Sequence, residues 1–220
     1  NGQAAGPTVA TLLGNGDGTL RPGGALADPH QPEAIAAADV NHDGLIDLVA
    51  ANVDTSNTVT LYVGTGVNQF GAGLDIPTGS WTLRALLADF NGDSYLDLVA
   101  GGSNSQLQVR LGAKNGMFMV PSSQVIGAGE PSVPTAADLD GDGKLDLVVN
   151  NSKVGTITVL LGNGDGTFQP GTTMVVGTRI GRLVIANFNG DGRPDLAMTT
   201  TATPAVSSPS LIVMLNQTSQ

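Results

Sequence analysis

The sequence contains no cysteine, and this absence removes several kinds of chemistry at once. No disulfide, thiolate metal site or cysteine nucleophile can form. Aromatic side chains are also scarce, with one Trp, two Tyr and five Phe among 220 residues. No apolar run approaches the roughly 18 residues of a membrane-spanning helix. No N-terminal segment has the charged-then-apolar pattern of a signal peptide, so we expect either that one was removed or that the chain is cytosolic.

Basic residues are few as well, nine Lys and Arg against 19 Asp and Glu, and the formal net charge is −10. There is no basic cluster, so nucleic acid is not an expected partner. Twelve of the 19 acidic residues fall in four short segments, and outside them seven acids are balanced by seven bases. The acidity therefore belongs to four local sites and not to a generally acidic surface.

Those four segments are copies of one phrase that recurs about every fifty residues, at 39–47, 89–97, 138–146 and 187–195. A fixed period of this size indicates a repeat architecture. Oxygen-bearing side chains occupy positions 1, 3, 5 and 9 of each phrase, and such a set suits a hard cation, with Ca²⁺ the best fit. The candidate ligands are Asp39, Asn41, Asp43 and Asp47; Asp89, Asn91, Asp93 and Asp97; Asp138, Asp140, Asp142 and Asp146; and Asn187, Asn189, Asp191 and Asp195.

An EF-hand is the competing calcium motif, and the sequence excludes it. The twelfth position of an EF-hand loop requires a bidentate Glu. Counting twelve residues here reaches Ala50, Ala100, Val149 and Met198. Strand-like stretches also flank the phrases where an EF-hand has helices.

Short β-rich runs surround each phrase, and no segment has the helical period. In the first unit they cover residues 34–38, 46–51, 58–63 and about 70–76. Four strands per unit of about fifty residues predict an all-β fold, a β-propeller of four-stranded antiparallel blades with about four blades in this chain. Small residues recur in the first strand of every unit, which indicates that this strand is innermost.

A second phrase joins the third and fourth strands, at Leu13–Leu20 and Leu161–Phe168, with degenerate versions at Val63–Phe70 and Leu111–Phe118. Its Asn-Gly and Asp-Gly pairs are typical of hairpin turns, so we interpret them as turns and not as metal ligands. The final residues of the phrases are predicted to be core anchors between blades: Leu20, Phe70, Phe118 and Phe168.

These phrases resemble the FG-GAP or VCBS repeats of integrin α-subunit propellers and of fungal and bacterial calcium-loaded propellers. The resemblance implies one Ca²⁺ between the first two strands of each blade, up to four in all. It also implies that the backbone carbonyl at position 7 is a ligand. The residues at that position share no side-chain chemistry, as expected when only the backbone is used: Leu45, Tyr95, Lys144 and Arg193.

The four sites are not expected to be equal, because affinity tends to rise with ligand charge and rigidity. The candidate ligands carry formal charges of −3, −3, −4 and −2 in chain order. The segment 138–146 should therefore bind most tightly, and 187–195 most weakly. Ser94 stands where the other copies have Gly, so a left-handed backbone would be strained there. We interpret the ions as structural, since binding to clustered carboxylates stabilises the folded state.

The chain is interpreted as one propeller domain, residues 1–220, with a partial blade at 1–33, blades at 34–81, 82–130 and 131–179, and a partial blade at 180–220. Three arrangements of the ends are open. The N-terminal strand completes the last blade and closes a small ring, the chain is part of a larger propeller, or the open edges pair between subunits in a dimer or filament.

No catalytic constellation stands out, so we do not expect an enzyme. The calcium loops and the Gly-rich turns share one face, and the opposite face varies between units. We expect a protein or glycan ligand there, with Trp81 as a candidate contact. The sequence thus predicts a secreted or cell-surface calcium-binding module for ligand binding or adhesion. The alternative is a structural subunit of a calcium-stabilised oligomer or filament. A lectin is less favoured because no aromatic platform repeats.

Overall fold

The computed structural model describes residues 8–78, 82–102, 106–119, 122–125, 131–152, 154–177, 179–200 and 210–217. Within these ranges every regular element is a β-strand. The described residues include no helix that is long and apolar enough to cross a membrane. The predicted all-β fold is therefore confirmed.

Four antiparallel sheets follow one another along the chain, and we number them blades one to four. Blade one contains β3 (Pro32–Ala38), β4 (Asp47–Asn52), β5 (Thr58–Tyr62) and β8 (Leu74–Pro77), and blade two contains β9 (Thr82–Ala88), β10 (Asp97–Gly102), β11 (Gln106–Arg110) and β12 (Ser122–Val125). Blade three contains β13 (Pro131–Ala137), β14 (Asp146–Asn151), β15 (Thr156–Leu160) and β16 (Thr172–Val175), and blade four contains β17 (Ile180–Ala186), β18 (Asp195–Thr200) and β19 (Leu211–Met214).

Two hairpins stand outside the blades. The N-terminal hairpin pairs β1 (Thr8–Gly14) with β2 (Leu20–Ala27), as the turn phrase at Leu13–Leu20 predicts. A smaller hairpin of β6 (Gly64–Gly66) and β7 (Gln69–Phe70) interrupts the connection between β5 and β8. Phe70 therefore belongs to this small hairpin and not to the fourth strand of blade one.

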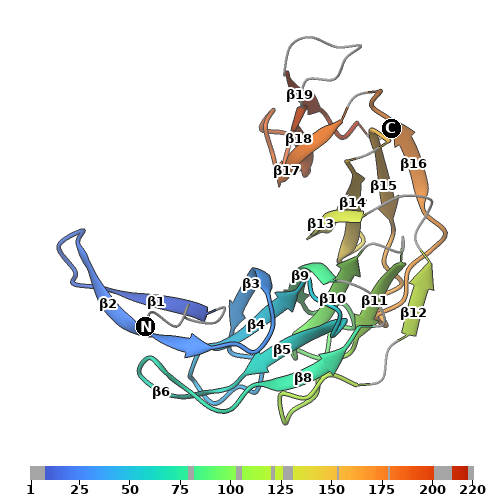
Figure 1. Cartoon of the computed structure of the whole chain (residues 1–220). Coiled ribbons are helices and arrows are strands. Elements are labelled where there is room, and N and C mark those ends of the chain that lie inside the picture. The colour runs from blue at the N-terminus through green and yellow to red at the C-terminus, as the bar shows by residue number, and fades with distance from the viewer. Residues whose placement is uncertain are drawn as a thin grey trace.

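The first strand of each blade is the innermost one, as its small side chains indicate. β3 contacts β9, β9 contacts β13, and β13 contacts β17. These strands line the concave side of a curved row of blades, and the fourth strands stand toward the outside (Figure 1). Alanines such as Ala36, Ala85 and Ala136 leave room for this convergence.

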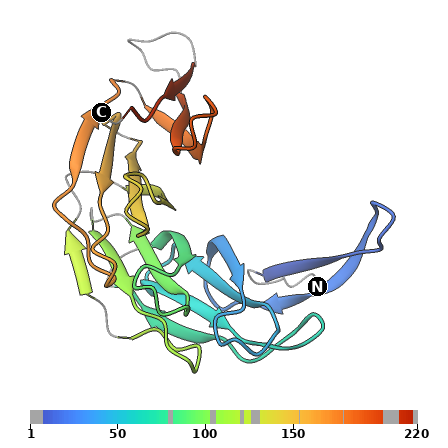
Figure 2. The same cartoon turned by 180° about the vertical axis from the view of Figure 1, so that it is seen from behind.

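The row of blades is an open arc in which the two ends stand apart. The N-terminal hairpin lies at one end and blade four at the other, in both opposite views (Figures 1 and 2). Among the described residues β2 pairs with β1, and β19 pairs with β18 alone. In this structure the N-terminal strand does not complete the last blade.

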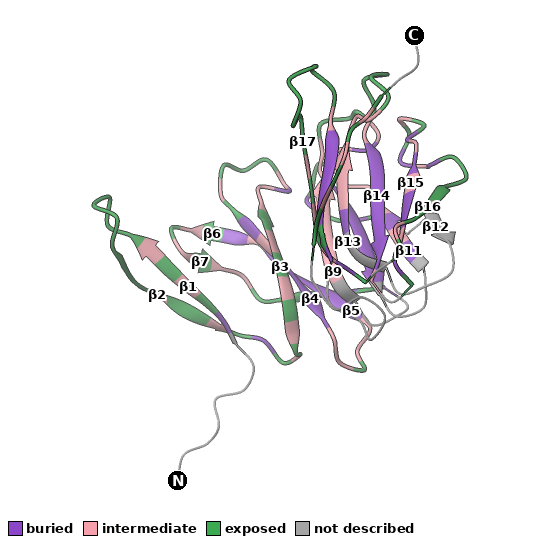
Figure 3. Ribbon diagram, turned by 90° about the horizontal axis from the view of Figure 1, so that it is seen from above, coloured by how far each residue is buried: buried purple, intermediate pink, exposed green. Residues whose placement is uncertain are grey.

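Apolar cores lie between neighbouring blades. Buried residues concentrate in the middle strands of the blades, for example β4, β5 and β14, whereas β1 and β2 are largely exposed (Figure 3). Phe118 is buried against residues of blade one and Phe168 against residues of blade two, so both are inter-blade anchors as predicted. The prediction was wrong for Leu20, which is 63% exposed because no blade among the described residues packs against this side chain.

His30 links the segment that follows the N-terminal hairpin to blade one through two side-chain hydrogen bonds. His30 Nδ1 lies 3.0 Å from Asp54 Oδ2, and His30 Nε2 lies 3.0 Å from Asp75 Oδ2. The backbone N–H of His30 also donates to the buried Asp28 carboxylate. Burial of the ring lowers its pKa, but hydrogen bonds and charges from Asp75 and Asp54 outweigh this effect, so the pKa of His30 lies above its ordinary value.

The raised pKa of His30 predicts a pH-dependent contribution to stability. The unfolded state binds fewer protons than the folded state between the two pKa values, so the contribution is complete below the unfolded pKa near 6.5 and is lost as the pH rises through the folded pKa. His30→Gln should therefore destabilise the chain by about 1 kcal/mol at pH 6 and by much less at pH 9. Urea unfolding in saturating calcium checks this, and an equal loss at both pH values would contradict it.

Candidate metal sites

Each acidic phrase forms the loop between the first and second strands of a blade. We refer to residues 39–47, 89–97, 138–146 and 187–195 as loops one to four. Position 1 follows the innermost strand directly, and position 9 is the first residue of the second strand. Two strands of one sheet therefore fix both ends of every loop, and the predicted ligands between them gather at one edge of the blade.

The Asp at position 9 is buried in all four loops, and both of its oxygens accept backbone N–H groups. One oxygen accepts from position 2 of its own loop, and the other accepts from the second residue after the third strand. The donors are Val40 and Gly64 for Asp47, Phe90 and Gly112 for Asp97, Leu139 and Gly162 for Asp146, and Phe188 and Asn216 for Asp195, at 2.7–2.8 Å.

These paired hydrogen bonds to position 9 were not predicted from the sequence, although three of the four donors after the third strand are glycines that recur in it. A Cβ on Gly112 would lie 2.2 Å from Leu96 O, and one on Gly162 would lie 2.2 Å from Leu145 O. At these two positions a side chain would collide with the backbone of the loop, so glycine allows the close approach. Each position-9 carboxylate thus joins two connections of its blade and keeps one lone pair on each oxygen for a further partner.

The residue at position 1 organises the turn of the loop. In loop three, Asp138 accepts from Gly141 N at 2.7 Å, Asp142 N at 3.1 Å and Gly143 N at 2.9 Å. Asp89 accepts the same three bonds in loop two. Asn187 has one acceptor oxygen in place of two, and in loop four only the bond from Gly190 N is present. Loop four therefore has fewer hydrogen bonds from its own backbone to position 1 than loops two and three have.

Loop three differs from the others at position 3. Asn41, Asn91 and Asn189 each donate through Nδ2 to the carboxylate at position 5. Asp140 has no such donor, and ligand oxygens of Asp138, Asp140 and Asp146 lie within 4.8 Å of one another. Of the described residues, these three form the one group of His, Cys, Asp or Glu side chains gathered this closely.

The pKa values of two position-9 carboxylates are raised, first by burial and then by the neighbouring carboxylates. Burial raises the pKa of Asp146, and the charges of Asp140 and Asp142 raise it further. Burial likewise raises the pKa of Asp97, with smaller contributions from Asp93 and Asp89. Loops two and three therefore place negative charge where water cannot solvate it well, and a divalent cation would relieve that cost.

At position 7 the backbone N–H donates to the position-5 carboxylate in every loop, from Leu45, Tyr95, Lys144 and Arg193. This bond explains why the side chain at position 7 is free to vary. Lys144 also places its Nζ 2.8 Å from Asp142 Oδ2, and its hydrogen bond holds the pKa of Asp142 below the ordinary value. The pair is partly exposed, so it contributes little to stability.

Two non-glycine residues adopt left-handed backbone conformations in loops one and two. Ser94 has φ 73°, as its place at position 6 predicts, and His42 at position 4 has φ 59°. The His42 ring stacks on the Tyr95 ring with centroids 5.0 Å apart, which joins loop one to loop two. This contact could not be predicted from the sequence, because the two residues occupy different positions of their repeats.

The predicted ligand-binding contact on the opposite face, Trp81, lies outside the described residues. Most of the connection between β18 and β19 lies outside them as well. The candidate site that the structure does describe is therefore the row of four loops, and loop three is its most complete member.

Comparison with known proteins agrees with the repeat. A family profile described as FG-GAP-like repeat matches three consecutive, overlapping segments, residues 39–100, 89–149 and 138–198. These segments begin at position 1 of loops one, two and three. Together they cover more than half of the chain.

The chain is also similar to cartilage acidic protein 1 of Homo sapiens, with 28% identity over 174 residues. The match covers 67% of this chain and 25% of the relative, so the chain spans about a quarter of that protein. Among solved structures it resembles the V. cholerae biofilm matrix protein Bap1 (TM-score 0.54, 18% identity, 98% of this chain and 40% of that one). It also resembles BBS1N from a complex with ARL6DN (TM-score 0.54, 14% identity, 77% and 47%). Both likenesses concern the propeller fold.

Proposed function

The chain belongs to the FG-GAP-like repeat family, and from this premise we propose that it is a calcium-binding β-propeller module for ligand binding or adhesion outside the cell. Ca²⁺ would be held by the side chains at positions 1, 3, 5 and 9 of each loop, with the position-7 carbonyl as a further ligand. In this role the ions stabilise the blades and take no part in a reaction.

One observation carries the calcium proposal. Three carboxylates of loop three, from Asp138, Asp140 and Asp146, direct oxygens within 4.8 Å of one another, and Asp146 is buried. Carboxylate oxygens are the ligands that Ca²⁺ prefers, and no nitrogen or sulfur ligand is present to favour a softer metal. The donor set therefore fits the ion that the family implies.

The extracellular and recognition parts of the proposal rest on the similar proteins and on the arrangement of the faces. One similar structure is named as a biofilm matrix protein, and the curated relative is named for cartilage. The scaffold repeats its loops on one face, so a protein or glycan partner is proposed for the opposite, variable face, with Trp81 as a candidate contact. We propose a non-enzymatic role, because the carboxylates of the repeats are assigned to metal binding.

Replacing Asp140 by asparagine should weaken the tightest calcium site while leaving the fold intact. Asn already stands at this position in the other three loops, and its oxygen can still accept the bond from Asp142 N. Removing one negative charge about 4 Å from a divalent ion in water costs about 2 kcal/mol, which corresponds to roughly thirtyfold in affinity. Calorimetric titration of the whole chain with Ca²⁺ at neutral pH measures this change.

Asp165→Asn is the matched control. It makes the same change of net charge in the Gly-rich turn of blade three, where Asp165 bonds Thr167 and is interpreted as a turn residue. Its calcium affinities should equal those of the unsubstituted chain. Equal weakening by both substitutions would mean that only long-range charge matters and that loop three is not the tight site.

A further inference from the structure

The dipeptide Asn-Gly occurs at five places among the described residues, in two kinds of surroundings. Two copies lie in calcium loops, where Asn91 and Asn189 are the candidate ligands at position 3. The other three lie in turns of the second repeated phrase, at Asn15, Asn115 and Asn163. The glycine has a positive φ of 72–83° in every copy, and all but the copy at Asn115 are followed by Asp. Differences between these copies therefore come from their surroundings.

Asparagine is chemically labile, and a following glycine makes it most so because no side chain shields the glycine nitrogen. That nitrogen attacks Cγ of the asparagine, and the Cγ–Nδ2 bond breaks to leave a succinimide ring. Ammonia departs with the proton that the glycine nitrogen loses to solvent. Water then opens the ring to aspartate, or to isoaspartate, whose main chain runs through Cβ and Cγ. The reaction requires a free glycine N–H and an asparagine amide that can turn toward it.

In the calcium loops hydrogen bonds tie both reacting groups. In loop two, Gly92 N donates to Asp89 Oδ1 at 2.7 Å. Asn91 Oδ1 accepts from Asp93 N at 3.0 Å, and Asn91 Nδ2 donates to Asp93 Oδ2 at 3.0 Å. The same three bonds hold Asn189 and its glycine in loop four. The nucleophile and the amide must therefore both be released before either loop can react.

The turn of blade three lacks this protection. Asn163 is exposed, and its side chain makes one hydrogen bond, from Nδ2 to Thr167 Oγ1 at 2.9 Å. Within the described part of the chain, the N–H of Gly164 makes no hydrogen bond. Asn15 is held by the same single bond to Thr19. In this turn the glycine nitrogen is free, and one bond alone restrains the amide.

The turn of blade two is intermediate between these cases. Gly116 N donates to Ala113 O at 2.8 Å, and Asn115 Oδ1 accepts from Met117 N at 3.1 Å. A Cβ on Gly116 would lie 2.8 Å from Asn41 Cβ, so this turn packs closely on loop one. The structure thus predicts that Asn115 reacts more slowly than Asn163.

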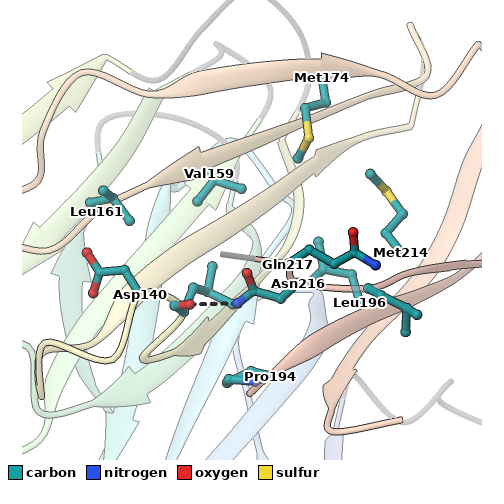
Figure 4. Close-up of a pocket in the computed structure, with 11 residues that line it drawn as sticks. Asp140, Val159, Leu161, Met174, Pro194, Leu196, Met214, Asn216 and Gln217 are labelled. Atoms are coloured by element: carbon teal, nitrogen blue, oxygen red, sulfur yellow. Dashed lines mark hydrogen bonds between the residues drawn. The ribbon is translucent and has the colours of Figure 1, made fainter. Parts of the chain in front are cut away.

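Asn163 lies where a change of the backbone would affect two neighbouring contacts. Leu161 lines a pocket of about 310 Å³ beside loop three, at the start of this turn (Figure 4). Gly162 N donates to Asp146 at 2.8 Å, and Gly166 N donates to a backbone carbonyl of loop two at 3.2 Å. Isoaspartate at position 163 would insert one backbone carbon between these two donors. The contact between blades two and three should therefore weaken.

We propose that Asn163 is a site of spontaneous deamidation, and that the hydrogen bonds of loops two and four protect Asn91 and Asn189 from the same reaction. One dipeptide is thus reactive in the turn and inert in the calcium loops. The inference goes beyond the proposed function, because the protection comes from hydrogen bonds within the protein and not from a bound ion.

Peptide mass mapping of the full chain tests the proposal. One sample is incubated folded in millimolar calcium at mildly alkaline pH, and a second is incubated in concentrated urea. In the folded sample Asn91 and Asn189 should deamidate at least about tenfold more slowly than Asn163, since their hydrogen bonds must open first. In urea the three rates should be similar, because each asparagine is followed by Gly-Asp. Equal rates in the folded chain, or a difference that persists in urea, would overturn the proposal.

The effect on the blades is measured on the same material. Asn163→Asp is the matched control, since it has the charge of the deamidated product without the extra backbone carbon. The deamidated chain, separated by ion exchange and mapped to position 163, should unfold at a lower urea concentration than Asn163→Asp. An equal unfolding midpoint would contradict the expected weakening between blades two and three.

Discussion

Removal of calcium should cost the chain most of its stability. A site at one hundred times its dissociation constant stabilises the folded state by about 2.7 kcal/mol, so three filled sites together contribute about 8 kcal/mol. Whole domains are stable by only about 5–15 kcal/mol. Without ions, the buried carboxylates of Asp97 and Asp146 would keep the raised pKa that reflects their unfavourable charge. We therefore expect the calcium-free chain to be partly or fully unfolded at neutral pH.

Urea unfolding followed by circular dichroism, in millimolar calcium and in excess EGTA, measures this loss. Magnesium serves as the control cation, since it prefers a smaller octahedral site with several waters and should restore little of the stability. An unfolding midpoint that is the same with calcium and with EGTA would show that the loops are ordinary acidic turns. In that case the hydrogen bonds within the loops would suffice to hold the blades.

Asp146→Asn should destabilise the chain by about 2–3 kcal/mol more than Asp140→Asn. Both substitutions remove one charge from loop three, but Asp146 is buried and its two oxygens accept Leu139 N and Gly162 N. Asparagine has one acceptor oxygen, so its amide nitrogen would face one of these N–H groups. Losing a buried hydrogen bond to a charged group, and leaving its donor unpaired, costs about that amount.

The comparison requires urea unfolding of both variants in saturating calcium. Because the metal effect of one lost charge is common to the two, their difference isolates the two hydrogen bonds by which Asp146 joins loop three to the connection after β15. A smaller effect for Asp146→Asn than for Asp140→Asn would mean that position 9 acts through the metal alone.

Much of the fold could be predicted from the sequence because its signals are local and repeated. The spacing of the acidic phrases, the β-rich runs between them and the small residues of the first strands predicted four-stranded blades with that strand innermost. Phe118 and Phe168 were identified as anchors because they end a repeated phrase. Leu20 ends the same phrase, yet it is exposed, because a core position also requires a neighbouring blade.

What could not be predicted depends on contacts between separate parts of the chain. The sequence indicates that Asp47, Asp97, Asp146 and Asp195 bear oxygens, but not that two backbone N–H groups bind each of them. The stack of His42 on Tyr95 and the bonds of His30 to Asp54 and Asp75 join residues with no shared periodicity. The open arc also follows from how the blades pack, and the strand count alone allowed a closed ring.

The most direct test of the account is the calcium content of the purified chain, measured by atomic emission after gel filtration in buffer freed of excess calcium. The four loops predict between two and four ions per chain, with loop three the last to be emptied and Asp140→Asn losing an ion before Asp165→Asn does. Less than one ion per chain, together with unchanged stability, would contradict the claim that calcium holds these blades.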